Sequence, residues 1–172
     1  MKIFAETPRL ILRELLVIDD KGMFELDSNA EVLKYLYTQP HTKIEQSRDV
    51  IAFIRKQYEE NGIGRWAVIE KKSGYFIGWA GLKLVTQTIN NCTNYYDVGY
   101  RLIPRYWGRG YATEVSKASV NYGFNTLKLN LIYATASMHN LASRKVLEKT
   151  GLTFIEEFLH DNQLEAWYEI RK

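Results

Sequence analysis

A glycine loop is the part of this sequence whose residue types and spacing point most directly to chemistry. A strand pattern ends at Pro104, and Gly108 and Gly110 follow just before a helical pattern begins. Glycine tolerates a positive φ and lets a ligand approach the main chain, while the first amide groups of a helix have no partners within that helix. Those amides and the helix dipole favour an anion such as a phosphate, and Arg105 and Arg109 add positive charge beside the loop.

Two common kinds of phosphate loop are excluded by the sequence. A P-loop requires Gly-Lys followed by Ser or Thr, and this triplet does not occur. A dinucleotide-binding loop requires a third glycine where Thr113 stands and an acidic residue about 20 positions beyond the loop, where Asn130 stands. Two interpretations stay open: a phosphate loop of another kind, and a strand-to-helix turn with a purely structural role.

The elements that position this loop follow from the hydrophobic periods. Alternating or β-rich runs predict strands, and apolar positions three and four residues apart predict helices. The strands are expected at residues 9–14, 66–69, 75–82, 95–103, 129–136, 154–160 and 164–170. The helices are expected after Asp19, at 31–36, from the capping residue Thr42 to Gly62, at 110–124 and at 140–149. This order of strands and helices predicts a mixed α/β sandwich.

Length and composition limit the class of protein further. The 172 residues fit one domain, which we expect to span residues 1–172. A net charge of +3 is too small to indicate nucleic-acid binding. The lone Cys92 excludes an intramolecular disulfide and a zinc site, and no long apolar segment indicates export or membrane insertion. We therefore expect a cytoplasmic protein without a metal site.

The glycine loop resembles the acyl-CoA loop of the GNAT superfamily of N-acetyltransferases. The family pattern is Gln or Arg, two residues, Gly, one residue, and Gly or Ala, and Trp107-Gly108-Arg109-Gly110-Tyr111-Ala112 occupies it here. Trp107 departs from the usual Gln or Arg. An aromatic residue at this position resembles the pattern of the RimJ/RimL-type branch, whose members acetylate protein N-termini, polyamines and other amines. Arg105-x-x-Gly108-x-Gly110 also matches, but residues 100–104 anchor the first alignment.

The resemblance extends over nearly the whole chain. Residues 7–13 are similar to the opening strand of the branch, 76–82 to its third strand, 97–100 to its fourth, and 140–152 to its second cofactor motif. These matches imply the GNAT fold, in which a central, mostly antiparallel seven-stranded sheet splays between strands 4 and 5. Helices cover both faces of that sheet.

The resemblance implies a site for acetyl-CoA between the splayed strands. The pantetheine arm would bind along the fourth strand as an added strand would, at Tyr100, Arg101 and Leu102. Gly99 fits a bulge or a close main-chain approach where the splay begins. The pyrophosphate would bind main-chain N–H groups among Gly108, Arg109, Gly110, Ala112 and Thr113. Trp107 and Tyr111 of the same motif are further candidates to contact the cofactor.

The resemblance also implies which residues move protons. The attacking amine must be neutral, and removing a proton at pH 7 from an amine with a pKa near 10.4 costs about 4.6 kcal/mol. Asp97 matches an acidic residue of the family's fourth strand and is our first candidate for the base, ahead of His139 and His160. A charge that only faces solvent is the alternative role of Asp97.

The leaving thiolate needs a proton or a hydrogen bond in return. Many relatives use a Tyr seven residues after the Asn of the second cofactor motif, but Leu147 stands there. RimL-like members carry a Ser three residues after that Asn, so Ser143 is the candidate for this role and for contact with CoA. Asn140 would hold the pantetheine amide, although Asn is also a preferred helix N-cap.

The resemblance thus implies an acetyl-CoA-dependent N-acetyltransferase that acetylates a primary amine by direct attack in a ternary complex. The alternative is a catalytically impaired acyl-CoA-binding module, which Leu147 suggests. We expect a small-molecule or peptide amine as the acceptor and neither nucleic acid nor membrane as a partner, while a homodimer stays open. Tyr35, Tyr37 and Trp66 are candidates to line the acceptor cleft, because segments near the first helices form the substrate side in relatives.

Overall fold

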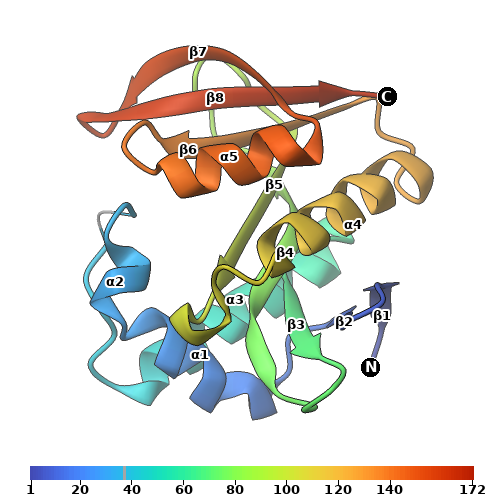
Figure 1. Cartoon of the computed structure of the whole chain (residues 1–172), viewed down its shortest axis with the longest axis vertical. Coiled ribbons are helices and arrows are strands. Elements are labelled where there is room, and N and C mark those ends of the chain that lie inside the picture. Colours follow the sequence, from blue (N-terminus) through green and yellow to red (C-terminus); the bar gives the residue numbers. More distant parts are fainter. Residues whose placement is uncertain (37) are drawn as a thin grey trace.

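One open sheet organises the chain, of which this computed structural model describes residues 1–36 and 38–172. Within these residues eight strands follow the order β1-β2-β3-β4-β5-β6-β8-β7 (Figure 1). Neighbouring strands are antiparallel, except that β5 and β6 are parallel. The strands are β1 (Ile3–Glu6), β2 (Leu10–Arg13), β3 (Trp66–Glu70), β4 (Phe76–Val85), β5 (Tyr95–Leu102), β6 (Leu131–Ser137), β7 (Thr153–His160) and β8 (Gln163–Arg171).

Strand β1 is the one that the sequence analysis did not predict. It pairs with β2 across a short turn that contains Pro8. We predict from the sequence that Pro8 opens an edge strand, but β2 lies inside the sheet because β1 covers its outer side. The four residues of β1 are too few to show a period. The other seven strands are confirmed, with ends that differ by a few residues.

Five α-helices pack on the two faces of this sheet in the part of the chain that the structure describes. Successive side chains of a strand point to opposite faces, and β5 shows which helices lie on which face. Arg101 bonds to Asp27 of the first helix, whereas the preceding Tyr100 bonds to Ser143 of the last. The helices are α1 (Asp20–Asp27), α2 (Ala30–Leu33), α3 (Ile44–Asn61), α4 (Tyr111–Asn125) and α5 (Leu141–Thr150). Helices α1 and α3 pack together on one face, and α4 and α5 on the other. Two short 3-10 helices, η1 (Val17–Asp19) and η2 (Pro104–Tyr106), precede α1 and α4.

The long helix α3 begins two residues later than the predicted cap. Its first residue is Ile44, and the side-chain oxygen of Gln46 accepts the N–H groups of Thr42 and Lys43 at 2.8 and 3.0 Å. A side chain inside the helix therefore bonds the amides at its start, and Thr42 is not the N-cap. The predicted end is confirmed, because Gly62 adopts a φ of 68° after the last turn. In the described residues, no helix combines the length and apolar character that crossing a membrane requires.

The sequence predicts two hairpins, because Lys72-Ser73-Gly74 and Asp161-Asn162 each separate two strand patterns, and both hairpins are confirmed. Gly74 adopts a φ of 73° between β3 and β4. Asp161 and Asn162 both have positive φ, 47° and 61°, between β7 and β8. Two successive positive φ values match the right-handed twist of the flanking strands, which is why this turn suits a two-residue loop.

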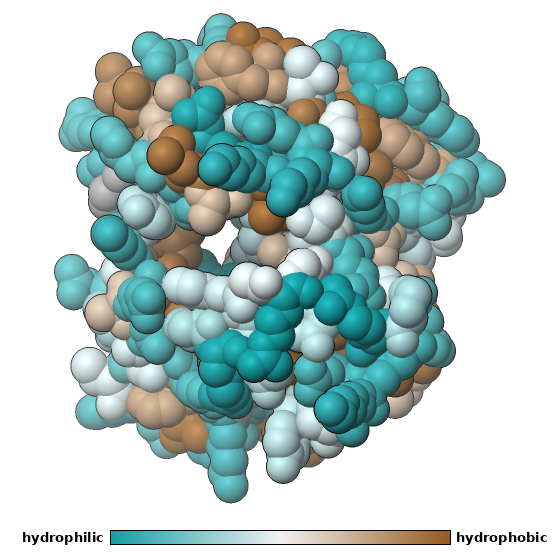
Figure 2. Space-filling model, viewed as in Figure 1, coloured by the Kyte–Doolittle hydropathy of each residue, from teal (hydrophilic) through white to brown (hydrophobic). Residues whose placement is uncertain are grey.

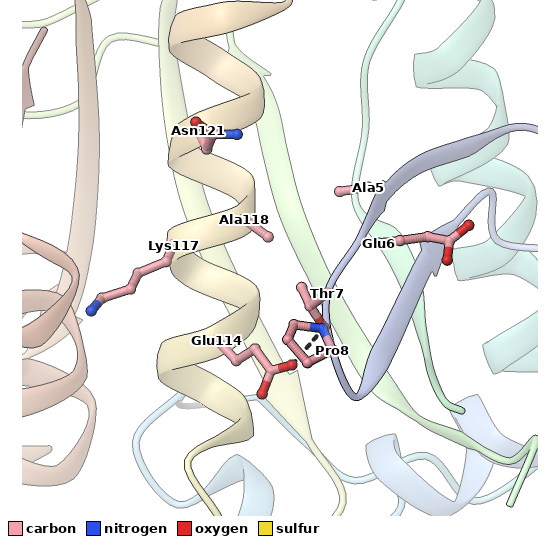
Figure 3. Close-up of a pocket in the computed structure, with 8 residues that line it drawn as sticks. All are labelled: Ala5, Glu6, Thr7, Pro8, Glu114, Lys117, Ala118 and Asn121. Atoms are coloured by element: carbon pink, nitrogen blue, oxygen red, sulfur yellow. Dashed lines mark hydrogen bonds between the residues drawn. The ribbon is translucent and has the colours of Figure 1, made fainter. Parts of the chain in front are cut away.

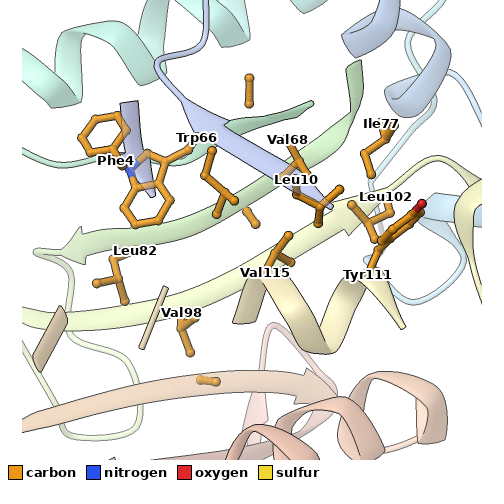
Figure 4. Packing of buried hydrophobic residues seen from close by; sticks show 14 of the residues in the cluster. Phe4, Leu10, Trp66, Val68, Ile77, Leu82, Val98, Leu102, Tyr111 and Val115 are labelled. Atoms are coloured by element: carbon orange, nitrogen blue, oxygen red, sulfur yellow. The ribbon is translucent and has the colours of Figure 1, made fainter. Parts of the chain in front are cut away.

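The main core covers both faces of the sheet, with Met23, Leu26 and Ile51 of α1 and α3 on one side and α4 on the other, and Figure 4 shows part of it. Trp66 of β3 is fully buried in it, stacked on Phe4 with ring centroids 4.8 Å apart and edge-on to Tyr122 of α4 at 5.0 Å. The prediction that Trp66 lines the acceptor cleft is therefore wrong. All five residues of β3 are buried, so its sequence shows no alternation that could indicate where the indole points.

The sheet opens between β5 and β6. In the described residues one pair, Asp97 with Tyr133, joins the two strands, and beyond it they diverge (Figure 1). Figure 2 shows an opening between the half of the molecule that contains β6 to β8 and the half that contains β1 to β5. These strands are the fourth and fifth of the seven predicted ones, so the predicted splay is confirmed.

Candidate functional site

The open edge of β5 offers main-chain groups to a ligand. The N–H of Ile103, just after the strand, donates to the carbonyl of Ile77 in β4 at 3.0 Å. Antiparallel pairing alternates along a strand, so Tyr100 and Leu102 direct their main-chain groups away from β4, into the gap that β6 leaves. The indole N–H of Trp107 donates to the Leu102 carbonyl at 2.7 Å and ties the glycine loop to the end of the strand.

The glycine loop has the backbone that its sequence predicts. Gly108 and Gly110 adopt φ values of 71° and 80°, and Gly110 is the N-cap of α4. A Cβ built on Gly108 would meet no atom within 4 Å, so the loop is open to a ligand there. Tyr111, Ala112 and Thr113 form the first turn of α4, where amides have no acceptor within the helix. Together with the helix dipole, these amides give the loop the properties of an anion site.

Arg9 holds this loop against the first hairpin. Its guanidinium donates to the carbonyl of Arg109 at 2.9 Å and lies 4.3 Å from the ring centroid of Tyr111. The same side chain pairs with Glu114 of α4 at 2.6 Å, and Thr7 donates to that carboxylate (Figure 3). A shallow cavity of about 370 Å³ lies beside this contact, between the β1–β2 turn and α4. The contacts fix the conformation in which the loop presents its amides.

The start of α5 brings three predicted site residues together. Asn140 is the N-cap, and its side-chain oxygen accepts the N–H of Ser143 at 3.0 Å. The hydroxyl of Ser143 lies 2.9 Å from that of Tyr100, so a hydrogen bond joins α5 to β5. Burial raises the pKa of Tyr100 to about 12, although the bond with Ser143 opposes this shift. Both hydroxyls are therefore neutral at pH 7, and the capping role of Asn140 is confirmed.

Asp97 lies on the other face of the sheet from Ser143. Its carboxylate pairs with the guanidinium of Arg65, which also donates to the carbonyls of Asp97 at 2.8 Å and of Gly81. Both charged side chains are buried, so the alternative of a solvent-facing charge is wrong. A Cβ on Gly99 would lie 2.7 Å from Nη2 of Arg65. Gly99 is therefore needed for the approach of a side chain, whereas the prediction was a bulge or a close main-chain approach, and the β4–β5 register is regular at this residue.

A cavity of about 430 Å³ lies on this same face, under α1 and α3. Trp79 of β4 is one of its walls, with the guanidinium carbons of Arg65 and Arg101 at 5.4 and 5.1 Å from the ring centroid. Arg101 pairs with Asp27 at 2.5 Å. Because Arg101 faces Trp79 across the β4–β5 ladder, its main chain is directed toward β4. It contributes a side chain to the cavity rather than the predicted main-chain contact.

The structure corrects the predicted acceptor side and adds to it. Tyr35 is half-buried but does not line the cavity, and Tyr37 lies outside the described residues. The histidines that we rank behind Asp97 are exposed to solvent. The sequence analysis missed the lining residues Asp27, Arg65, Trp79 and Lys83, and it named Arg101 for a different contact. One signal for Arg65 is present in the sequence, because Gly99 interrupts a strand of larger residues and leaves room there for the Arg65 guanidinium.

These parts form a route through the molecule. An anion site lies at the start of α4, main-chain donors and acceptors line the open edge of β5, and a cavity with charged walls lies on the opposite face. Figure 2 shows the opening between the two halves of the molecule at this level. The arrangement suits an elongated ligand with a phosphate at one end, while a second ligand enters from the cavity.

Comparison with known proteins supplies the chemistry of such a ligand. Residues 9–153 match the family model described as an acetyltransferase (GNAT) domain. The uncharacterised N-acetyltransferase YoaA of Bacillus subtilis is 31% identical, over 91% of this chain and 88% of that protein. The spermidine N(1)-acetyltransferase of Escherichia coli K12 is 27% identical, over 91% of this chain and 80% of its own.

A solved structure extends the comparison to the fold. RimL, a ribosomal L7/L12 alpha-N-protein acetyltransferase in complex with coenzyme A, matches this chain with a TM-score of 0.80. The match covers 99% of this chain and 98% of RimL at 14% identity. At this identity the two proteins share a fold, and the fold is one that binds coenzyme A in RimL.

Proposed function

Because the chain belongs to the GNAT acetyltransferase family, whose members use acetyl-CoA, we propose that it acetylates a primary amine by direct attack in a ternary complex. Acetyl-CoA supplies a thioester whose carbonyl carbon reacts with the neutral amine and releases the CoA thiol. One observation carries the proposal: the glycine loop at the start of α4 lies beside the open edge of β5. We infer that residues 1–172 form one N-acetyltransferase domain.

The residues present fit this coenzyme. The amides of residues 108–113 would hold its pyrophosphate, since nothing covers Gly108 and the first turn of α4 has free donors. Tyr100 would supply main-chain groups to the pantetheine arm. The carbonyl of Leu102 is already bonded to Trp107, so the N–H of Leu102 is the group left for the ligand. The side-chain oxygen of Asn140 caps α5, which leaves its NH₂ group to donate to an amide carbonyl.

Asp97 is the residue that we propose as the acceptor of the amine's proton. It stands at the last paired position of β5, where the splay begins, and its ion pair with Arg65 faces the acceptor cavity. To take a proton, Asp97 must loosen one hydrogen bond to Arg65. A carboxylate that only positions Arg65 is the competing role, and the two roles differ in their effects on kcat and on KM for the acceptor.

Ser143 is the residue that we propose as the donor to the leaving sulfur. Tyr100 supports it, because a phenol with a pKa of about 12 stays protonated and can donate to the Ser143 hydroxyl. This pair takes the place of the Tyr that many relatives carry at the position of Leu147. Leu147 itself is buried in the core and has no polar atom to offer.

We propose the chemical class of the acceptor, a primary amine, and not a particular compound. One relative is named for spermidine, and RimL is named for the N-terminus of a ribosomal protein. Trp107 and Ser143 support a place in the RimJ/RimL-like branch. A second candidate function rests on Leu147: a chain without the usual acid would retain acyl-CoA but not transfer the acetyl group.

Release of free thiol tests the proposal. Purified protein is incubated with acetyl-CoA and a panel of primary amines, and its melting temperature is measured with and without CoA. We expect thiol release with at least one class of amine and a rise in melting temperature with CoA. No turnover combined with no rise would overturn the proposal. Stabilisation by CoA without thiol release on any amine would favour the acyl-CoA-binding module.

A further inference from the structure

The cavity under α1 and α3 carries more positive than negative charge. Among the described residues that line it, Arg65, Lys83 and Arg101 are cations and Asp27 is the one carboxylate. Arg101 is paired with Asp27, and Arg65 is paired with Asp97 beside the lining. The ion pairs of the described residues thus use both carboxylates, and none of these pairs includes Lys83. The cavity therefore holds one cation that the protein's own acids do not neutralise.

Strand register places this cation inside the cavity. Lys83 lies opposite Asp97, and Trp79 lies opposite Arg101, across the ladder between β4 and β5. The guanidinium of Arg65 fills the space between these two pairs, over Gly99. Lys83 therefore extends a row of cations along the floor of the cavity. Because β4 and β5 are rigid central strands, the spacing of this row is fixed by the fold.

Lys83 is half-buried without full compensation for its charge. Burial lowers its pKa, and the charge of Arg65 lowers it further, while Asp97 opposes the shift. A cation held partly out of water is stabilised when an anion binds beside it. A second observation points to unmet hydrogen-bonding capacity, since Nε of Arg101 is buried and has no partner. The remaining titratable wall residue, His41, bonds to Ser47 at 2.9 Å and adds no negative charge.

We propose that the acceptor amine carries an anionic group, a carboxylate or a phosphate, which Lys83 binds while the amine points to the gap between β5 and β6. This inference rests on the proposed acetyl transfer and names the class of its acceptor. A polyamine such as spermidine has no anionic group and brings further positive charge against Lys83 and the two arginines. Like charges in a confined site oppose binding, so spermidine is a poor ligand of this cavity.

Matched amines test the proposal by binding as well as by turnover. The dipeptide amides Ala-Asp and Ala-Asn differ in the charge of one side chain and form the carboxylate pair, with Ala-Lys as a cationic comparison. O-phosphoethanolamine and ethanolamine form the phosphate pair. Binding to CoA-saturated protein is measured by calorimetry, and thiol release is measured with acetyl-CoA. The variant Lys83→Met removes the charge with little change in length. Lys72→Met, in the exposed β3–β4 turn, is the control.

The expected result is selective binding of the anionic member of at least one pair, by about tenfold or more. The pair that shows this preference tells whether the acceptor carries a carboxylate or a phosphate. The preference should disappear in Lys83→Met and persist in Lys72→Met. Equal binding within both pairs, tighter binding of spermidine, or an equal loss for all amines in Lys83→Met would overturn the inference. Selective binding without thiol release would support the anionic class and overturn acetyl transfer.

Discussion

The hydroxyl of Tyr100 lies 2.9 Å from the hydroxyl of Ser143, and this bond links β5 to α5 beside the opening in the sheet. Asn140 fixes Ser143 from the other side by capping its N–H. Tyr100 thus holds the hydroxyl and Asn140 holds the main chain of the same residue, so Ser143 loses little further freedom when it donates to a ligand. The pair therefore marks the place where proton donation to the leaving group can be measured.

Replacing Ser143 by Ala should lower kcat far more than it lowers affinity for CoA. Removal of a positioned proton donor costs about 100-fold in rate, whereas the main-chain contacts of the coenzyme are untouched. Tyr100→Phe removes only the support of Ser143 and should give a smaller decrease. Stopped-flow turnover and calorimetry with CoA separate the two effects. An unchanged kcat in Ser143→Ala would restrict Ser143 to packing at the start of α5.

Gly110→Glu should abolish CoA binding. The new carboxylate would stand at the N-terminus of α4, where the pyrophosphate is expected, and a side chain at a φ of 80° is also strained. Gly74→Glu is the matched control, because Gly74 has a φ of 73° and open space around it but lies in the β3–β4 turn. Both variants should lose stability, and only Gly110→Glu should lose affinity in a CoA titration. Equal affinity in the two variants would place the coenzyme elsewhere.

Arg9→Met should weaken CoA binding although Arg9 need not touch the coenzyme. The variant frees the carbonyl of Arg109 and breaks the contact with Glu114, so the loop must be ordered when the ligand binds. We expect the Kd for CoA to rise about fivefold, which corresponds to roughly 1 kcal/mol. Arg48→Met removes a comparably exposed ion pair, with Asp20, that does not include a residue of the loop and should leave the Kd unchanged. Identical Kd values for both variants would contradict the inference that Arg9 orders the glycine loop.

The parts of this structure that sequence predicts well are those that local chemistry determines. Gly62 is predicted to end a helix because a positive φ is common there, Gly110 is predicted to open one as part of a glycine loop, and the structure confirms both. Asn140 was placed as a cap because its side chain reaches an amide three residues away. The glycine loop, both hairpin turns and seven strands follow from the same short-range rules.

Contacts between distant residues escaped the sequence analysis. Arg65 and Asp97 are 32 positions apart in the sequence, and Arg9 and Glu114 are 105 positions apart. Contacts between residues so far apart leave no local sequence pattern. The acceptor cavity is built almost entirely from such contacts, which is why its cationic floor was missed. The resemblance to a family supplied the coenzyme, but it did not indicate which charges surround the acceptor.

Glu165 should make the folded state less stable as pH rises. Burial raises its pKa in the folded protein above the ordinary 4.5, although the charge of His160 opposes the shift. A raised folded pKa means that the stabilising effect is complete below the unfolded pKa and is lost as pH rises through the folded pKa. Glu165→Gln should therefore match the wild type near pH 4 and exceed it at pH 7 in urea unfolding. The exposed Glu157→Gln serves as the control, and a Glu165→Gln variant less stable than wild type at pH 7 would contradict the sign.

Asp97→Asn distinguishes a proton acceptor from a residue that only positions Arg65. Either role predicts a loss of stability, by about 3 kcal/mol, because a buried guanidinium loses its counter-charge. Asp19→Asn is the matched control for this loss, since Asp19 forms a buried pair with Arg13 that lies away from the cavity. Urea unfolding should give similar destabilisation for both variants.

Turnover per folded molecule then separates the roles of Asp97. Measured at saturating CoA, which favours the folded state, Asp19→Asn should keep its kcat. If Asp97 takes the proton from the amine, Asp97→Asn should lose about 100-fold in kcat with little change in KM for the acceptor. If Asp97 only positions Arg65, the loss appears chiefly in KM for the acceptor. We expect the first outcome, because the positive charge of the entering amine competes with Arg65 for the carboxylate oxygens and so loosens the ion pair.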